Sequence, residues 1–469
     1  MSRKLLFKGD DLYSGATSNL NNTIQFKQLD ERGAVSYTFD YDTQCTIYNN
    51  ISSNAFSSMG SLSAAPFAMA VDGHGNVFAG TIDFTGSLSK LYVQYYGTDE
   101  WTLLFTSDQQ NGIHAIVIDG NNNIYVGGRF SSITDNNQYG PPVTYNYNTI
   151  VKGEFVEGEW IWSPMCDFFL NGNSPIVNAL VLDSNILYAS GQFDGNHGYG
   201  EDVLLSNFAR CNINILDHDL HVWECVGNGI AQNGGYSSVE GLTLAIQDID
   251  DTKIIVIGGV FNVVDVDTAA KNIAAYDLTN NVWNTLNGGC PGSGVRSAAF
   301  CGNNLYFTGF FTSAGGTLAS NVARCTFTTF TTNVFNSLGT GFDSVGDSIA
   351  VNGNDIYMVG DFKTVDSTII ANGVCKYDET YESWTAVSTG APYMKVVCAK
   401  DDILYLGGIF SSIARTLASY IAKADTTQFV DIVINDQFAT TIVPQEYAIY
   451  SYFVANDLLV KSSSGYKDN

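Results

Sequence analysis

The chain has 469 residues, of which 45% are hydrophobic, 13% aromatic and only 14% charged. This composition supplies a large apolar core and excludes an intrinsically disordered chain. Lys and Arg number 21 against 47 Asp and Glu, which gives a formal net charge of −26. We expect no nucleic-acid partner, because such a surface repels phosphate.

The N-terminal segment MSRKLLFKGDDLYSG carries a short apolar run at 5–7. That run is too short for the apolar region of a secretory signal peptide, and no later segment approaches the roughly 18 apolar residues of a membrane span. The sequence therefore predicts no signal peptide and no membrane insertion. We expect an intracellular or virion-associated protein.

The nine cysteines are scattered along the chain without a CxxC pair. Their odd number and wide spacing argue against a disulfide framework and against a zinc site. Cys301, Cys325 and Cys398 lie in apolar strand patterns, where a free thiol packs as a small hydrophobe. We expect no metal or other cofactor.

A repeat dominates the chain from residue 124 onward. Each copy has an apolar pair, then small residues, then a Gly followed two places later by Phe. The copies are IYVGGRF (124–130), LYASGQF (187–193), IVIGGVF (255–261), LYFTGFF (305–311), IYMVGDF (356–362) and LYLGGIF (404–410). VFAGTIDF (77–84) is a weaker earlier copy, and DLYSGA (11–16) is weaker still.

The glycines of these copies are separated by 48 residues (Gly360 to Gly408) up to 68 (Gly191 to Gly259). The clearest unit, 239–288, reads as four short strands: VEGLTLAI, IVIGGVF, NIAAYD and VWNTLNGG. No stretch shows a 3.6-residue period, so strands rather than helices are predicted. A repeat of about 50 residues with four strands is typical of a β-propeller blade.

Tight turns join the first two strands of the units, as in AVDGHGNVF (70–78) and VIDGNNNIY (117–125). Asp, Gly and Asn suit such reversals because they tolerate positive φ and bond to nearby backbone. A calcium loop is the alternative, but the EF-hand spacing and its final Glu are missing. We therefore interpret these segments as hairpin turns. The Gly pairs of the second strands mark close approach of another backbone or of a bulky side chain, and the aromatic residues of the outer strands could fill that space.

The repeats resemble those of the kelch and galactose-oxidase central-domain group, in which a double Gly is followed by Tyr and Trp with six residues between them. Tyr276 and Trp283, Tyr377 and Trp384, and Phe155 and Trp162 have this spacing. The corresponding pairs of other units depart from it: Tyr95 and Trp101, Cys211 and Trp223, Cys325 and Phe335. The pattern is also similar to propeller repeats in fungal cell-polarity markers and in proteins of large DNA viruses.

We predict an all-β fold, a single β-propeller of four-stranded blades. Eight units are counted, and seven blades with an accessory N-terminal segment is the alternative. The propeller is expected over 1–434, with units at about 4–60, 66–107, 112–165, 176–228, 239–288, 295–339, 345–390 and 394–434. The remaining segment, 435–469, is expected to be a closing strand or an accessory tail.

Catalytic groups are scarce in the sequence. Only five histidines exist, and no Ser-His-Asp order or phosphate-binding loop is found. The copper site that galactose oxidase carries has no matching residues here. We interpret His218 and His221 as turn residues and His114 as a packing residue on a first strand. Carboxylates from several blades could still converge on the axis, so a glycosidase remains open.

The long loops are all predicted on one face, and loops on a rigid scaffold commonly carry function. The 131–149 loop is rich in Tyr and Asn, which suits recognition. We predict a non-enzymatic structural or protein-interaction module, a component of a virion or another large assembly, with a protein partner or self-assembly. A carbohydrate-binding or glycoside-hydrolysing propeller is the alternative, with a glycan as ligand. The candidate interaction residues are Asn137, Tyr139, Tyr145, Tyr147, His197, Tyr199, Tyr236 and Phe342.

Overall fold

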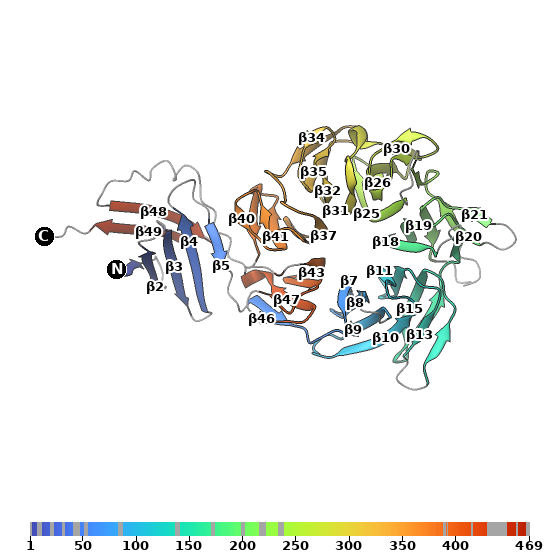
Figure 1. Ribbon diagram of the computed structural model, residues 1–469, viewed down its shortest axis with the longest axis horizontal. Helices are drawn as coiled ribbons and strands as arrows, with labels where there is room; N and C mark the ends of the chain where they lie inside the picture. Colours follow the sequence, from blue (N-terminus) through green and yellow to red (C-terminus); the bar gives the residue numbers. More distant parts are fainter. Residues whose placement is uncertain are drawn as a thin grey trace.

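The computed structural model describes residues 55–82, 88–136, 141–169, 174–197, 202–214, 222–232, 239–387, 391, 393–413 and 416–428, together with the backbone of seven strands within 2–50 and 448–465. The described part is all-β, with two short 3-10 turns, η3 (Leu286–Gly288) and η4 (Thr426–Gln428). Four-stranded antiparallel sheets follow one another around a ring (Figure 1). The predicted β-propeller is therefore confirmed. No helix in these ranges is long and apolar enough to cross a membrane.

The ring has seven blades among the described residues. Blade 1 is β7 (Ala65–Val71), β8 (Val77–Ile82), β9 (Lys90–Gln94) and β10 (Trp101–Ser107). Blade 2 is β11 (Ile113–Ile118), β12 (Ile124–Gly128), β15 (Ile150–Val156) and β16 (Glu159–Pro164). Blade 3 is β18 (Ile176–Asp183), β19 (Ile186–Gln192), β22 (Phe208–Asn212) and β23 (Trp223–Cys225). Blade 4 is β25 (Glu240–Ile249), β26 (Thr252–Val260), β29 (Ile273–Asp277) and β30 (Val282–Asn284).

The remaining blades follow the same order. Blade 5 is β31 (Gly292–Cys301), β32 (Asn304–Phe311), β35 (Val322–Phe327) and β36 (Asn333–Ser337). Blade 6 is β37 (Gly346–Asn352), β38 (Asp355–Gly360), β41 (Val374–Asp378) and β42 (Ser383–Ala386). Blade 7 is β43 (Met394–Lys400), β44 (Ile403–Gly408), β47 (Ile421–Asp425) and β6 (Phe56–Ser58).

A strand from the N-terminal part of the chain closes this ring. The first strand of each blade contacts the first strand of the next, and β43 of blade 7 contacts β7 of blade 1. The fourth strand of blade 7 is β6, which pairs antiparallel with β47, Ser58 opposite Ala422 and Phe56 opposite Ala424. Closure removes the free sheet edges that an open array would expose. The closing strand thus comes from β6 and not from the C-terminal tail.

The first expected unit, 4–60, is not a blade of this ring. Its strands β1 (Ser2–Leu6), β2 (Leu12–Ser18), β3 (Thr23–Asp30), β4 (Gly33–Asp40) and β5 (Ile47–Asn50) form a separate five-stranded sheet. The hairpin of β48 (Ala448–Ala455) and β49 (Leu458–Gly465) contacts it through β1, and Figure 1 shows both beside the ring. The segment after Gly15 lacks the Phe that defines the repeat. The expected boundary at 434 lies outside the described residues.

The repeated Gly of the second strand is required by the backbone of the first strand. A Cβ added at Gly259 would lie 2.0 Å from the carbonyl oxygen of Glu240, and one at Gly191 would lie 2.0 Å from that of Ile176. The preceding Gly258 faces Thr243 and, from the next blade, Val295. Of the two expected neighbours, backbone is the one found at Gly259 and Gly191, whereas first-strand side chains and not outer-strand aromatics lie beside Gly258.

The outer-strand aromatic residues connect each blade to its neighbour. Tyr276 and Trp283 are direct cross-strand partners, as are Tyr377 and Trp384. In blade 2 the partner of Phe155 is Trp160, because Trp162 lies opposite Gly153. Several of these tryptophans donate to the linker that follows the preceding blade: Trp101 Nε1 to Met59 O (2.6 Å), Trp223 to Met165 O (2.7 Å), Trp283 to Gly227 O (2.7 Å) and Trp384 to Leu338 O (3.2 Å).

Candidate functional site

The two ends of the propeller differ in their connections. The turns between first and second strands and between third and fourth strands lie at one end, which we call the turn face. The connections from second to third strands and between blades lie at the other end, which we call the loop face. This division follows from the antiparallel order of every blade, and it places the long loops together as the sequence predicted.

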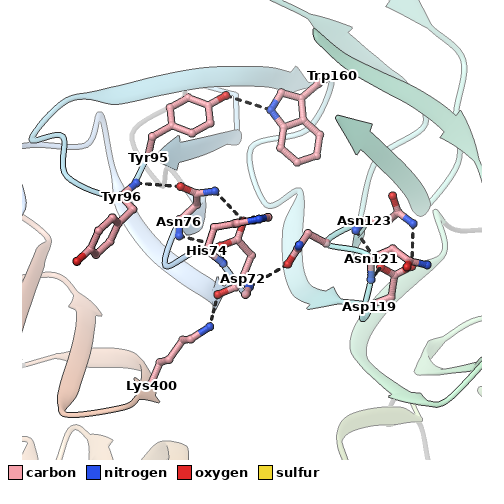
Figure 2. A network of polar contacts seen from close by, with 12 residues as sticks. Asp72, His74, Asn76, Tyr95, Tyr96, Asp119, Asn121, Asn123, Trp160 and Lys400 are labelled. Carbon is pink, nitrogen blue, oxygen red and sulfur yellow. Dashed lines mark hydrogen bonds and ion pairs between the residues drawn. The ribbon is translucent and has the colours of Figure 1, made fainter. Parts of the chain in front are cut away.

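On the turn face, two Asp side chains hold tight turns (Figure 2). The Asp119 carboxylate accepts hydrogen bonds from the backbone N–H of Asn121 and Asn123 at 2.9 Å and from the Asn123 amide at 2.9 Å. Asp72 accepts the same set from His74 and Asn76. No group of three or more His, Cys, Asp or Glu among the described residues could hold a metal ion. These carboxylates therefore act as turn residues.

On the turn face, hydrogen bonds also connect blade 1 to its two neighbours, blades 7 and 2. Lys400 of blade 7 donates to the carbonyl oxygen of Asp72 in blade 1, and Asn122 of blade 2 accepts from the N–H of Gly73 at 2.9 Å (Figure 2). Trp160 of blade 2 donates to the hydroxyl of Tyr95 in blade 1 at 3.3 Å. These contacts join blades 7, 1 and 2 at this end of the molecule.

On the loop face, every first strand carries a β-bulge at the same position. In each blade, one first-strand residue pairs with the repeated Gly of the second strand, and the strand pairing skips the first-strand residue after it. In blade 1, Thr81 takes the place of the Gly. We call the seven skipped residues the bulge ring: Phe67, His114, Asn178, Leu242, Arg296, Asp347 and Lys395. Bulges re-aim side chains at barrel rims and next to active sites.

The bulge ring faces the axis and not the blade cores. His114 and Asn178 are partly exposed although the residues on either side of each are buried. Three members from successive blades contact one another. Arg296 of blade 5 and Lys395 of blade 7 both bind the carboxylate of Asp347 in blade 6, the latter at 2.8 Å. The bulges therefore bring side chains from separate blades to one place.

The residue after the repeated Gly adds a second set of side chains to the same place. Asp361, which follows Gly360 in blade 6, accepts hydrogen bonds from Lys395 of blade 7 at 3.0 and 3.1 Å. Lys395 thus bridges Asp347 and Asp361, the two carboxylates that the structure brings together near the axis. Arg129 and Gln192 hold the position of Asp361 in blades 2 and 3.

In blade 2, the bulge-ring residue His114 lies near one cation, Arg129. His114 Nε2 lies 3.1 Å from Asn111 O. Burial lowers the pKa of His114; the hydrogen bond to Asn111 opposes this shift, and the charge of Arg129 adds to it. Arg129 Nε is buried without a hydrogen-bond partner, and no described carboxylate forms an ion pair with this side chain. A cation without a counter-ion is notable in a chain of net charge −26.

Small hairpins between the second and third strands line the loop face. They are β20–β21 (Gly195–His197, Asp202–Leu204), β27–β28 (Val263–Val264, Thr268–Ala269), β33–β34 (Ser313–Ala314, Thr317–Leu318), β39–β40 (Thr364–Val365, Ile369–Ile370) and β45–β46 (Ser412–Ile413, Thr416–Leu417). The residue four places before the third strand is exposed in each hairpin, and the next residue is buried. Four of the exposed residues, the hairpin aliphatics, are large: Leu204 (71%), Leu318 (83%), Ile370 (50%) and Leu417 (82%).

The described candidate residues lie mostly in packing positions. Tyr145 and Tyr147 stack on each other with ring centroids 5.1 Å apart and pack against the core of blades 1 and 2. Their hairpin, β13 (Ile133–Asp135) and β14 (Val143–Tyr145), extends the blade 1 sheet from β10. Phe342 is buried and stacks on Phe362 at 4.2 Å, so it does not offer a contact surface.

The other candidates lie wholly or partly outside the described residues. Asn137, Tyr139, Tyr199 and Tyr236 lie outside them, as do His218 and His221; His197 is in β20, but its side chain is not described. The eight cysteines in the described ranges are free. Burial raises the pKa of the Cys166 and Cys398 thiols to about 12, in keeping with packing as small hydrophobes.

Sequence reasoning missed the bulge ring and the hairpin aliphatics. The sequence did contain a signal for the hairpin aliphatics: Thr317–Ser320 and Thr416–Ser419 both read TLAS at the same position of two units. The bulges had no such signal, because their residues share no chemistry.

Comparison with known proteins gives a likeness of fold. No protein-family model and no curated protein sequence matches the chain. Among solved structures, it is similar to the WD40 β-propeller domain of Doa1, with a TM-score of 0.43 and 12% identity over 78% of this chain and 94% of that one. It is also similar to Saccharomyces cerevisiae Sqt1, with a TM-score of 0.41 and 9% identity over 88% of this chain and 98% of that one. Our propeller assignment rests on the sheet topology, and we draw no function from these likenesses.

Proposed function

We propose that this propeller is a protein-interaction module whose loop face docks a partner protein through the hairpin aliphatics. The observation that carries the proposal is the recurrence of exposed Leu204, Leu318, Ile370 and Leu417 at one register position of four blades. Single exposed apolar residues are common on protein surfaces, whereas these four recur at the same position of four blades on one face.

The charge of the chain selects the kind of partner. A second copy would bring two bodies of net charge −26 together, which opposes self-association through this face. A partner with aliphatic side chains flanked by Lys and Arg would be attracted instead. We therefore favour a basic protein over self-assembly.

We also propose that the blades are kelch-like and that the protein acts in a virion or another large assembly. The cross-strand contacts of Tyr276 with Trp283 and of Tyr377 with Trp384 support the first. Only the resemblance of the repeats supports the second. A glycan-binding role gains no specific support, because the described candidate aromatics Tyr145, Tyr147 and Phe342 are packing residues.

The proposal is tested with two double variants. Leu318→Asp/Leu417→Asp removes two hairpin aliphatics, and Val282→Asp/Val334→Asp makes the same kind of change at exposed positions of the fourth strands β30 and β36. Partners are identified by cross-linking mass spectrometry in the source cells, and affinity is then measured with purified partner. We expect the hairpin variant to lose about 100-fold or more in affinity, with unchanged unfolding.

Three results would count against the docking proposal. Equal loss in the Val282→Asp/Val334→Asp control would show that added negative charge alone weakens the contact. Cross-links that map to the turn face would place the interaction elsewhere. Light scattering that shows self-association abolished by Leu318→Asp/Leu417→Asp would replace the basic partner by a second copy.

A further inference from the structure

The bulge ring carries an inference that does not depend on the hairpin aliphatics. We propose that its blade 2 to blade 4 side binds the carboxylate of a small ligand or chain end that also has an apolar portion. The carboxylate would lie at Arg129, beside His114 and Asn178, and the apolar portion would lie over Leu242 and Val260.

The repeat itself places these residues next to one another. In blades 6 and 7, the residue after the repeated Gly, Asp361, contacts the bulge residue of the next blade, Lys395, at 3.0 Å. Arg129 holds the same position in blade 2, and Asn178 is the bulge residue of blade 3. Arg129 is thus expected beside Asn178, as Asp361 is beside Lys395.

The two halves of this region differ in charge balance. On the blade 5 to blade 7 side, Arg296 and Lys395 are matched by Asp347 and Asp361. On the blade 2 side, Arg129 has a buried Nε without a partner, and its charge adds to the lowering of the pKa of His114. A planar guanidinium binds carboxylate or phosphate through two parallel hydrogen bonds.

The surroundings select a ligand of low charge. Phosphate-rich ligands would be repelled by the net charge of −26, whereas a single carboxylate carries little of that cost. Asn178 and Gln192 supply neutral donors that fix orientation, and Leu242 and Val260 follow at once in blade 4. A few polar groups that converge beside apolar ones are typical of a small-ligand site.

Hexanoate is the first probe, with hexanamide as its uncharged equivalent, at constant ionic strength. Ligand-observed NMR titration on the full chain should show hexanoate binding and no hexanamide binding. Arg129→Gln should weaken hexanoate binding about tenfold or more, since it removes a charge-assisted contact. The matched control is Arg210→Gln, which changes an Arg paired with Glu224 on the outer strands of blade 3.

A second variant tests the same proposal if Arg129→Gln fails to fold. Asn178→Asp places a carboxylate of the protein itself beside Arg129, so it should abolish hexanoate binding while the melting temperature stays equal or rises. Equal binding of hexanoate by wild type, Arg129→Gln and Asn178→Asp would overturn the proposal. Equal binding of hexanamide would also overturn it, because the charge would then play no part.

The source of the carboxylate is distinguished with a short peptide that ends in leucine, prepared with a free and with an amidated C-terminus. Tighter binding of the free-ended peptide than of hexanoate assigns the site to a protein C-terminus; weaker binding assigns it to a small molecule. Both readouts are made in Leu318→Asp/Leu417→Asp as well. Unchanged binding there would keep this site separate from the docking surface proposed above.

Discussion

At the residue scale, the repeated glycines are explained by a close approach that composition cannot reveal. The sequence identified the positions, Gly128 to Gly408, but it left open whether backbone or a bulky side chain approaches them. The structure places a backbone carbonyl within 1.7 to 2.6 Å of an added Cβ at Gly128, Gly191, Gly259, Gly309, Gly360 and Gly408. Backbone cannot rotate away as a side chain can, so the position accepts only Gly.

Gly259→Ala should therefore be strongly destabilising. The added Cβ would lie 2.0 Å from Glu240 O, and the blade would have to distort to admit it. We expect a loss of about 3 kcal/mol in the free energy of unfolding, measured by urea titration. Gly120→Ala is the matched control, since no atom lies within 4 Å of its Cβ position and its φ is not in the left-handed region. Similar losses in both variants would refute this explanation.

Individual residues also show why the candidate site could not be predicted from the sequence. His114 was placed correctly on a first strand, but the bulge that turns it toward the axis is a property of pairing. One skipped residue in the register between Ile113 and Ala115 leaves no mark on composition. Phe342 was a candidate interaction residue, yet it is buried, forms a bridge to Val365 and stacks on Phe362.

At the element scale, tryptophans of the fourth strands join four of the seven blades to the linker before them. Four of them donate to a linker carbonyl, whereas Trp162 Nε1 is buried without a partner. The spacing of aromatic residues predicted the blades from sequence. It could not predict these bonds, because their acceptors are backbone groups more than 40 residues away in the chain.

Trp223 and Trp162 make a matched pair that isolates the value of this bond. Both are buried, and each has an edge contact with a Phe ring, at 4.9 and 4.8 Å. Both changes to Phe remove the same part of the indole ring, but Trp223→Phe also loses the 2.7 Å bond to Met165 O, whereas the N–H lost in Trp162→Phe has no partner. We expect Trp223→Phe to cost about 1 to 2 kcal/mol more in unfolding free energy. Equal costs would show that ring packing alone matters.

At the scale of the whole molecule, the fold class could be predicted because a four-stranded repeat leaves a pattern in every unit. The number of blades could not, since it depends on which strands pair across the closure. Residues 56–58 fall within the expected first unit, but they complete blade 7 by pairing with 422–424. This closure sets the seven-membered bulge ring and gives all hairpin aliphatics one face.

The most direct test is a disulfide across that closure. Ser57 and Lys423 are direct partners in the β6–β47 pair, so Ser57→Cys/Lys423→Cys should oxidise to an intramolecular cross-link, detected by peptide mass spectrometry, with the fold intact. Ser57→Cys/Ser337→Cys, which reaches to the fourth strand of blade 5, should form no such link. A seven-bladed ring closed by β6 predicts this pair of results. Failure of residues 57 and 423 to link within one chain that keeps its fold would contradict it.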